Sequence, residues 1–239
     1  MRKYTAAPHP FIIEPPEERR QAYKPGDELL FGLILVGKAI SYTSYFIHSF
    51  DALGAIGLGK GRARFKLKRV TSGGSTIYDP QERRVHPVSV LSLDVNNVDP
   101  AQTGKRQRVS LTFETPTRIK HNGRLTIDME FHHLVRSLLR RLALLGYFHC
   151  GLDPDTWDFA GLIRRAIEVR TTLRDLKWLD WERYSIRQGT RMRMGGFLGR
   201  IAFEGDLSPF LDILKAGEIL HVGKGATFGL GKYRLEQYC

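Results

Sequence analysis

The chain is poor in cysteine and has no long apolar run. Its 239 residues contain two cysteines, Cys150 and Cys239, too few for a disulfide framework or a zinc-binding cysteine pattern, which favours a reducing, cytoplasmic location. No apolar stretch approaches the length of a membrane span, which is about 18 residues. The N-terminus has no apolar signal-peptide core. We therefore expect no membrane partner, no bound metal and no cofactor.

Acidic residues are scarce relative to basic ones. Lys and Arg number 37 against 25 Asp and Glu, which leaves a formal net charge of +12. An excess of this size is typical of proteins that bind nucleic acid. The alternatives are a solvated basic surface, attraction to anionic lipid, and a small-molecule phosphate enzyme. The lipid alternative lacks a lysine-rich amphipathic helix, and the enzyme alternative lacks an acidic or metal-centred pocket.

Glycine is abundant, and the chain repeats one glycine-rich motif. Gly57-Leu58-Gly59-Lys60-Gly61-Arg62 and Gly229-Leu230-Gly231-Lys232-Tyr233-Arg234 are identical at five of six positions. Each copy follows a helical pattern and leads into a strand-like run, so the repeat predicts two tandem copies of one fold. Glycine lets backbone N–H groups approach an anion closely, and the flanking lysines and arginines add positive charge. Both loops therefore indicate a polyanion as ligand.

The hydrophobic pattern of the first half predicts few elements. These are a strand over 28–36, a helix over 42–53 that ends at Gly54, and a strand over 62–68 with one basic face. Residues 71–108 lose periodicity and are rich in turn residues, so we expect a hairpin or linker there.

The second half has a fuller pattern. It predicts a strand over 109–113, helices over 129–148 and 157–170, strands over 178–184 and 191–203, a helix over 208–217, a long glycine loop over 223–231 and a last strand over 232–235. This is the order of a ferredoxin-like domain with an added helix. The first half lacks the opening strand–helix unit. We therefore expect an α+β protein of two tandem ferredoxin-like (RRM-like) domains, the first incomplete, over 1–105 and 106–239.

The residues expected to contact a polyanion fall in three groups. The residues of the second glycine loop could instead have a purely structural role. The residues of the first loop could instead pack between the two halves. The third group lies at a strand connection and could be a solvated edge. The three groups are Gly223, Lys224, Gly225, Gly229, Gly231 and Lys232; Gly57, Gly59, Lys60, Arg62 and Arg64; and Arg187, Gln188, Arg191 and Arg193.

Two histidines are candidates for acid–base chemistry. His221 directly precedes the long glycine loop and is the histidine nearest in sequence to an anion held there; its alternative is a histidine whose polar atoms are satisfied by the backbone. His132 begins the first helix of the second domain, and a helix N-terminus favours a nearby phosphate. Its alternative is a plain surface histidine.

The chain resembles the CRISPR endoribonuclease family that cuts precursor CRISPR RNA, within the RAMP superfamily of CRISPR-associated proteins. The resemblance rests on Pro8-His9-Pro10-Phe11, Tyr45-Phe46, Gly195-Gly196-Phe197 and, most specifically, the loop from His221 to Tyr233. It implies binding of CRISPR repeat RNA and metal-independent cleavage. In such cleavage a 2′-hydroxyl attacks and leaves a 2′,3′-cyclic phosphate, with a histidine as general acid or base.

One feature of the family has no match in this sequence. The resemblance implies a catalytic histidine on or near the helix of the opening strand–helix unit, which the first half lacks. The alternative function is therefore that of a non-catalytic RNA-binding RAMP subunit of a CRISPR effector complex. Other CRISPR effector subunits and a second copy of the chain are further partners to be tested.

Overall fold

The structure is a computed structural model, and it describes residues 7–16, 20, 22–59, 61–95, 104, 106–185 and 189–238. The chain forms two compact units. One comprises Met1–Val36 with Leu93–Cys239, and the other comprises Gly37–Ser92. Compactness alone does not delimit ferredoxin-like halves, so the boundary expected near residue 105 stays a prediction.

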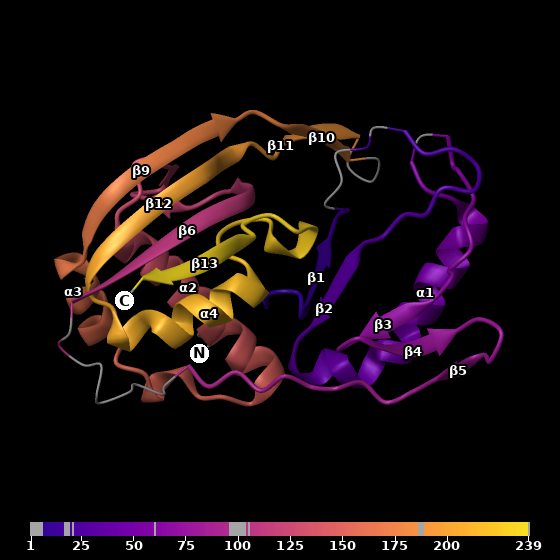
Figure 1. Cartoon of the computed structure of the whole chain (residues 1–239), viewed down its shortest axis with the longest axis horizontal. Helices are drawn as coiled ribbons and strands as arrows, with labels where there is room; N and C mark the ends of the chain where they lie inside the picture. Colours follow the sequence, from indigo (N-terminus) through magenta and orange to yellow (C-terminus); the bar gives the residue numbers. More distant parts are fainter. Residues whose placement is uncertain are drawn as a thin grey trace. The chain divides into compact units, whose positions relative to one another are not determined.

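The larger unit is built on a four-stranded antiparallel sheet. Its strands β6 (Arg106–Thr117), β9 (Arg170–Leu179), β12 (Gly196–Asp206) and β13 (Tyr233–Tyr238) lie in the order β13-β6-β12-β9. Helices α2 (Phe131–Leu145), α3 (Phe159–Glu168) and α4 (Leu211–Leu220) lie on one face of this sheet (Figure 1). The first strand in sequence thus lies inside the sheet between the last and the third, which is the ferredoxin-like arrangement expected for 106–239.

Alternation along the strands fixes which face is buried. Val109, Leu111 and Phe113 of β6 are almost fully buried, as are Ile201 and Phe203 of β12. They pack with apolar residues of α2 and α4 into one core. The intervening side chains lie on the opposite face, which none of the described helices of the larger unit covers (Figure 1).

Helices α2 and α3 begin with local side-chain caps. Glu130 and His133 form a reciprocal capping box at the start of α2, and the Asp158 carboxylate accepts a hydrogen bond from the Gly161 N–H at the start of α3. These caps satisfy N–H groups that the first helical turn leaves without partners. The helix expected over 129–148 therefore starts at Phe131, and it passes into a π-helical turn at Gly146–Cys150.

Several element boundaries of the second half were predicted wrongly, and the strand predicted over 191–203 is two strands, Thr190–Arg193 and Gly196–Asp206. Strand β9 begins at Arg170, whereas the sequence pattern extended a helix to that point and delayed the strand to 178. Most of β9 is exposed, so it carries little alternation to detect. Helix α4 also runs past Gly217 to Leu220. A β-carbon at Gly217 would collide with Leu138 and Tyr233, so this glycine permits close packing and does not end the helix.

Three hairpins extend the larger unit. β1 (Phe11–Glu14) pairs with β2 (Gly32–Leu35) beside the C-terminal glycine loop, β7 (Lys120–His121) pairs with β8 (Arg124–Leu125), and β10 (Glu182–Ser185) pairs with β11 (Thr190–Arg193). The β10–β11 hairpin continues beyond the ends of β9 and β12 (Figure 1). β2 is shorter than the strand expected over 28–36.

The smaller unit contains η1 (Gly37–Tyr42), α1 (Thr43–Ile56), β3 (Val70–Ser72), β4 (Ser75–Asp79) and β5 (Arg84–Val85). α1 does not end at Gly54, as predicted, but at Gly57. Gly54 instead allows the backbone of Phe65 to approach, and the Phe65 N–H donates to the Gly54 carbonyl at 3.1 Å. The strand predicted over 62–68 is reduced to a single bridge between Leu58 and Ala63. Within the described residues, no helix is both long and apolar enough to cross a bilayer.

Candidate nucleic-acid interface

The C-terminal glycine loop is a tightly packed segment. A β-carbon on Gly223 would lie 2.6 Å from the Arg118 carbonyl oxygen, and one on Gly229 would lie 2.8 Å from the Ile13 carbonyl oxygen. Gly225 and Gly231 have equally restricted surroundings, and all four have positive φ angles. The predicted glycine positions therefore serve packing against β1 and β6, and the exposed side chains of the loop are Lys224 and Phe228.

Positive charge gathers where this loop meets the end of β6. The Lys224 N–H donates to the Arg118 carbonyl at 3.0 Å. The pKa of Lys224 is lowered, first by repulsion from Lys120, then by desolvation and by Arg118. We name Arg118, Lys120 and Lys224 the Lys224 cluster. A bound phosphate would relieve their mutual repulsion, so this cluster suits a polyanion.

Three histidines adjoin the Lys224 cluster. The ring centroids of His121 and His133 are 3.9 Å apart, those of His132 and His133 are 4.1 Å apart, and those of His121 and His132 are 6.4 Å apart. We name them the histidine cluster. β7 carries a member of each cluster in consecutive positions, Lys120 and His121, and successive side chains of a strand point to opposite faces.

His133 serves the fold within this cluster. Its Nδ1 accepts a hydrogen bond from the Glu130 N–H at 3.1 Å, and its side chain is buried. Burial, together with the positive charge of its histidine neighbours, lowers the pKa of His133 to about 4. The ring is therefore neutral at neutral pH, and its accepting nitrogen is already occupied.

His132 and His121 are more accessible. The pKa of His132 is lowered, first by desolvation and then by the positive charge of Arg136, so its imidazole is a neutral proton acceptor at neutral pH. His121 is exposed, and its Nε2 lies 3.0 Å from the Asn122 side-chain nitrogen. The pair thus presents two imidazoles beside a cationic patch, an arrangement suited to acid–base chemistry on a phosphate ester.

The structure places His221 in the interior. Its side chain is fully buried; Nε2 lies 3.0 Å from Glu14 Oε1 and Nδ1 lies 3.2 Å from the Leu230 carbonyl. The hydrogen bond from His221 lowers the pKa of Glu14 against the opposing effect of burial, and Lys232, 3.2 Å from the same carboxylate oxygen, lowers it further. This geometry favours the structural interpretation of His221, which connects β1 to the glycine loop.

The first glycine loop lies in the smaller unit. Gly57 has a φ of 90°, and a β-carbon there would collide with the Arg62 carbonyl, whereas Gly59 borders open space. Arg62 and Arg64 are exposed. Lys60 lies outside the described residues. This loop therefore presents two arginines, and its contact with RNA stays a prediction.

The β10–β11 hairpin carries the third predicted group. Arg191 and Arg193 are exposed on β11, and the Arg191 guanidinium lies 3.8 Å from the Glu182 carboxylate. Arg187 and Gln188 lie outside the described residues. A hairpin with cations on one strand can follow a nucleic-acid backbone.

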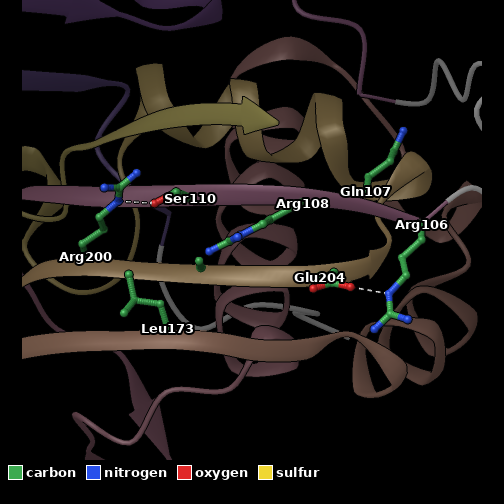
Figure 2. A pocket seen from close by; sticks show the side chains of 8 residues that line it. Arg106, Gln107, Arg108, Ser110, Leu173, Arg200 and Glu204 are labelled. Carbon is green, nitrogen blue, oxygen red and sulfur yellow. Dashed lines mark hydrogen bonds and ion pairs between the residues drawn. The ribbon is translucent and has the colours of Figure 1, made fainter. Parts of the chain in front are cut away.

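The open face of the sheet has a hollow of about 510 Å³. Figure 2 shows Arg200 reaching Ser110, with 2.7 Å between Nε and Oγ, and Arg106 paired with Glu204. Arg200 also lies 2.7 Å from the Glu236 carboxylate. Arg106 and Arg200 are each paired with a carboxylate, so the hollow is a weaker phosphate site than the Lys224 cluster.

The sequence interpretation missed Arg118, Lys120 and His121. The usable signal was Asn122-Gly123, the residue pair that favours a two-residue hairpin turn. Both residues have positive φ angles, and the turn joins β7 to β8. A hairpin predicted there would have placed Lys120 and His121 in one rigid element. Among the described residues, no group of three His, Cys, Asp or Glu side chains is arranged to hold a metal ion.

The ferredoxin-like fold and this basic, histidine-containing surface are those of a nucleic-acid-binding protein. A family model described as CRISPR-associated endoribonuclease Cas6 matches residues 111–233, and one described as AF_1859_N, N-terminal domain, matches residues 1–90. The Cas6 model covers more than half of the chain, so the chain belongs to the Cas6 family of CRISPR RNA-processing endoribonucleases. No curated protein matches it.

Solved Cas6 structures show the same fold at low sequence identity. A product complex of Thermus thermophilus Cas6 (TTHB231) matches with 18% identity and a TM-score of 0.57, over 95% of this chain and 82% of that chain. A product complex of Cas6 (TTHA0078) matches with 19% identity and a TM-score of 0.50, also over 95% and 82%. A chain of the partial Cas6-RT-Cas1–Cas2 complex matches with 19% identity and a TM-score of 0.57, over 96% of this chain and 39% of that chain. These matches show the tandem ferredoxin-like fold.

Proposed function

We propose that this protein binds CRISPR repeat RNA and cuts precursor CRISPR RNA without a metal ion. Family membership supports RNA processing. The observation that carries the proposal for this chain is that β7 carries a member of each cluster, Lys120 of the Lys224 cluster and His121 of the histidine cluster. The two clusters combine cations that would hold a phosphate with imidazoles that would move protons.

The proposed reaction is an intramolecular transesterification. The ribose 2′-oxygen attacks phosphorus, the bond to the 5′-oxygen breaks, and a 2′,3′-cyclic phosphate and a free 5′-hydroxyl result. Neutral His132 takes the proton of the 2′-hydroxyl. His121 gives a proton to the leaving 5′-oxygen. Lys224 and Lys120 stabilise the charge that develops on the phosphate oxygens.

His221 takes a different part in this scheme. Because its side chain is fully buried, it acts by positioning the glycine loop that carries Lys224. Lys232 is held by the same Glu14 carboxylate. The remaining predicted contacts, the first glycine loop and the β10–β11 hairpin, would bind RNA away from the cleaved bond.

The substrate itself provides the test. End-labelled precursor RNA from the matching CRISPR array, incubated in EDTA, should give one product that ends in a cyclic phosphate. An RNA with a single 2′-deoxy substitution at the cut should bind equally well and remain intact. Cleavage of the deoxy RNA at the same position would overturn the proposed chemistry.

A second candidate is a non-catalytic RNA-binding subunit. The observation that favours it is the lack of a match for the strand–helix unit on which the family resemblance expects the catalytic histidine. It predicts a salt-sensitive complex with repeat RNA and no product. Other CRISPR proteins, a homodimer and a cytoplasmic location remain predictions for either candidate.

A further inference from the structure

Two exposed tryptophans follow one another at the end of β9. Trp178 is 40% exposed and Trp181 is 42% exposed. The chain contains three tryptophans, and the third, Trp157, packs against the core beside Phe159. Indole rings are large apolar groups that are highly buried on average. Two of them exposed within four residues therefore suggest a binding surface.

The backbone that carries both indoles is held in place. The Met194 N–H donates to the Trp181 carbonyl at 2.7 Å. A β-carbon on Gly195 would lie 2.9 Å from the Leu179 carbonyl oxygen and 3.3 Å from the Trp181 nitrogen, so only glycine lets β12 begin so close to this segment. Gly195 thus lets the chain pass close to residues 179–181, while Trp178 and Trp181 stay 40% and 42% exposed.

The indole of Trp178 is also oriented. Its Nε1–H donates to the Asp180 carboxylate at 2.9 Å. This bond satisfies the one polar group of the side chain, so the ring has no further hydrogen-bonding demand and presents its aromatic surface. An aromatic side chain that is already oriented loses little entropy when a planar ligand stacks on it.

Positive charge accompanies the two indoles. Arg191 and Arg193 lie on the hairpin that continues this end of the sheet (Figure 1). The acidic neighbours are engaged, because Asp180 accepts from Trp178 and Glu182 pairs with Arg191. Aromatic rings interleaved with cations are the pattern by which proteins bind single-stranded nucleic acid.

We propose that Trp178 and Trp181 form a stacking platform for unpaired RNA bases, with Arg191 and Arg193 holding the adjoining backbone. The inference rests on the proposed RNA binding and adds a base-contacting site separate from the reacting phosphate. Stacking accepts any base, so the platform would bind single-stranded RNA with little sequence preference.

The test separates stacking from charge. The probes are an eight-nucleotide single-stranded RNA of adenosine and uridine, and inorganic polyphosphate, which has charge but no bases. Trp178→Ala and Trp181→Ala should each weaken RNA binding about tenfold and leave polyphosphate binding unchanged. Arg191→Ala with Arg193→Ala should weaken both. Leu173→Ala, an exposed apolar residue earlier on β9, is the matched control and should change neither.

Two further measurements distinguish a loss of stacking from misfolding of the variants. The phenylalanine variants W178F and W181F keep a stacking ring and should recover most of the RNA affinity. In a Trp157→Phe protein, RNA should quench the remaining fluorescence and polyphosphate should not. Unchanged RNA affinity in both alanine variants would contradict the proposed stacking platform and would favour a protein partner for this surface. So would equal losses of RNA and polyphosphate affinity.

The outcome is distinguishable from failure of the proposed function. Binding of the eight-nucleotide RNA is measured without cleavage, so it reports on the platform independently of the endoribonuclease activity. If the wild-type protein binds the eight-nucleotide RNA with quenching but never cuts precursor RNA, the endoribonuclease proposal fails and the platform stands.

Discussion

At the scale of single residues, Lys224 is the exposed cation of an otherwise packed loop. Lys120 and Arg118 already destabilise its charged form, as the lowered pKa records. Such a lysine gains more from a bound phosphate than an isolated surface lysine does. The position of one side chain therefore gives the glycine loop its proposed role in RNA binding.

Lys224→Gln should weaken repeat-RNA binding several-fold and reduce the slope of log affinity against log salt by about 1, because one phosphate contact is lost. Lys215→Gln is the control. Lys215 is an exposed lysine on α4, and its amino group lies 3.3 Å from the Asp212 carboxylate. Equal slopes for wild type and Lys224→Gln, measured by fluorescence anisotropy over a salt series, would contradict the assignment.

The buried His133 predicts a loss of stability in acid. Its pKa is about 4 in the folded state and about 6.5 when unfolded, so the unfolded chain binds the extra proton between these values. Stability is therefore full above pH 6.5 and falls as the pH drops toward 4. The loss at pH 5 should be about 2 kcal/mol relative to pH 7.

His133→Gln keeps an acceptor for the Glu130 N–H and removes the titrating ring. Urea unfolding at pH 7 and pH 5 should show a smaller acid destabilisation in this variant than in the wild type. His86→Gln, a change in an exposed histidine of the smaller unit, should leave the difference unaltered. The same acid loss in wild type and His133→Gln would show that another group titrates.

At the scale of elements, the glycine loop joins three segments of the larger unit. Gly223 approaches Arg118 of the segment after β6, Gly229 approaches β1, and the Gly231 N–H donates to the Pro116 carbonyl at 3.2 Å. Four positive φ angles and backbone neighbours at close range make this an element with a defined shape. Its glycines thus act on RNA binding through the position of Lys224.

Gly231→Ala should destabilise the protein by more than 2 kcal/mol, because a β-carbon would collide with the Val222 carbonyl in addition to the cost of a positive φ. Gly59→Ala is a matched control with a φ of 71° and open space around the new methyl group, and it should cost about 1 kcal/mol. Equal costs in thermal or urea unfolding would mean that the loop yields to the side chain.

The Glu14–His221 contact should couple β1 to this loop. In a double-mutant cycle with Glu14→Gln and His221→Gln, we expect a coupling free energy of about 1–3 kcal/mol. The exposed Arg234–Glu114 pair, 2.8 Å apart, is the comparison and should give less than about 1 kcal/mol. Because the folded pKa of Glu14 is lowered, its contribution is present above its unfolded pKa and is lost as the pH falls through the folded value. A cycle with no coupling would contradict this connection.

At the scale of the whole molecule, the second domain could be predicted from sequence and the first could not. The core positions of β6, α2 and α4 alternate or repeat strongly, because one face of each meets a single core. β9 is exposed along most of its length, so its start was misplaced. In the smaller unit, the alternation of basic residues over 62–68 predicts a strand. Among the described residues, this run forms only one β-bridge, between Ala63 and Leu58.

The residues of the candidate site also differ in whether the sequence predicts them. Lys224 and His132 could be predicted, because one lies in a glycine loop and the other at a helix start. Lys120 and His121 could not be predicted from periodicity, since a two-residue turn at Asn122-Gly123 brings them beside the helix. The burial of His221 depends on Glu14, 207 residues earlier, a distance over which sequence patterns carry no contact information.

The central claim is that the histidine cluster cuts RNA. The most direct measurement is the single-turnover cleavage rate of precursor CRISPR RNA in EDTA for the wild type, His132→Ala and the control His86→Ala. We predict that His132→Ala lowers the rate at least about 100-fold at unchanged RNA affinity, and that His86→Ala cuts at the wild-type rate. Wild-type cleavage by His132→Ala, or no cleavage by any of the three proteins, would contradict the account.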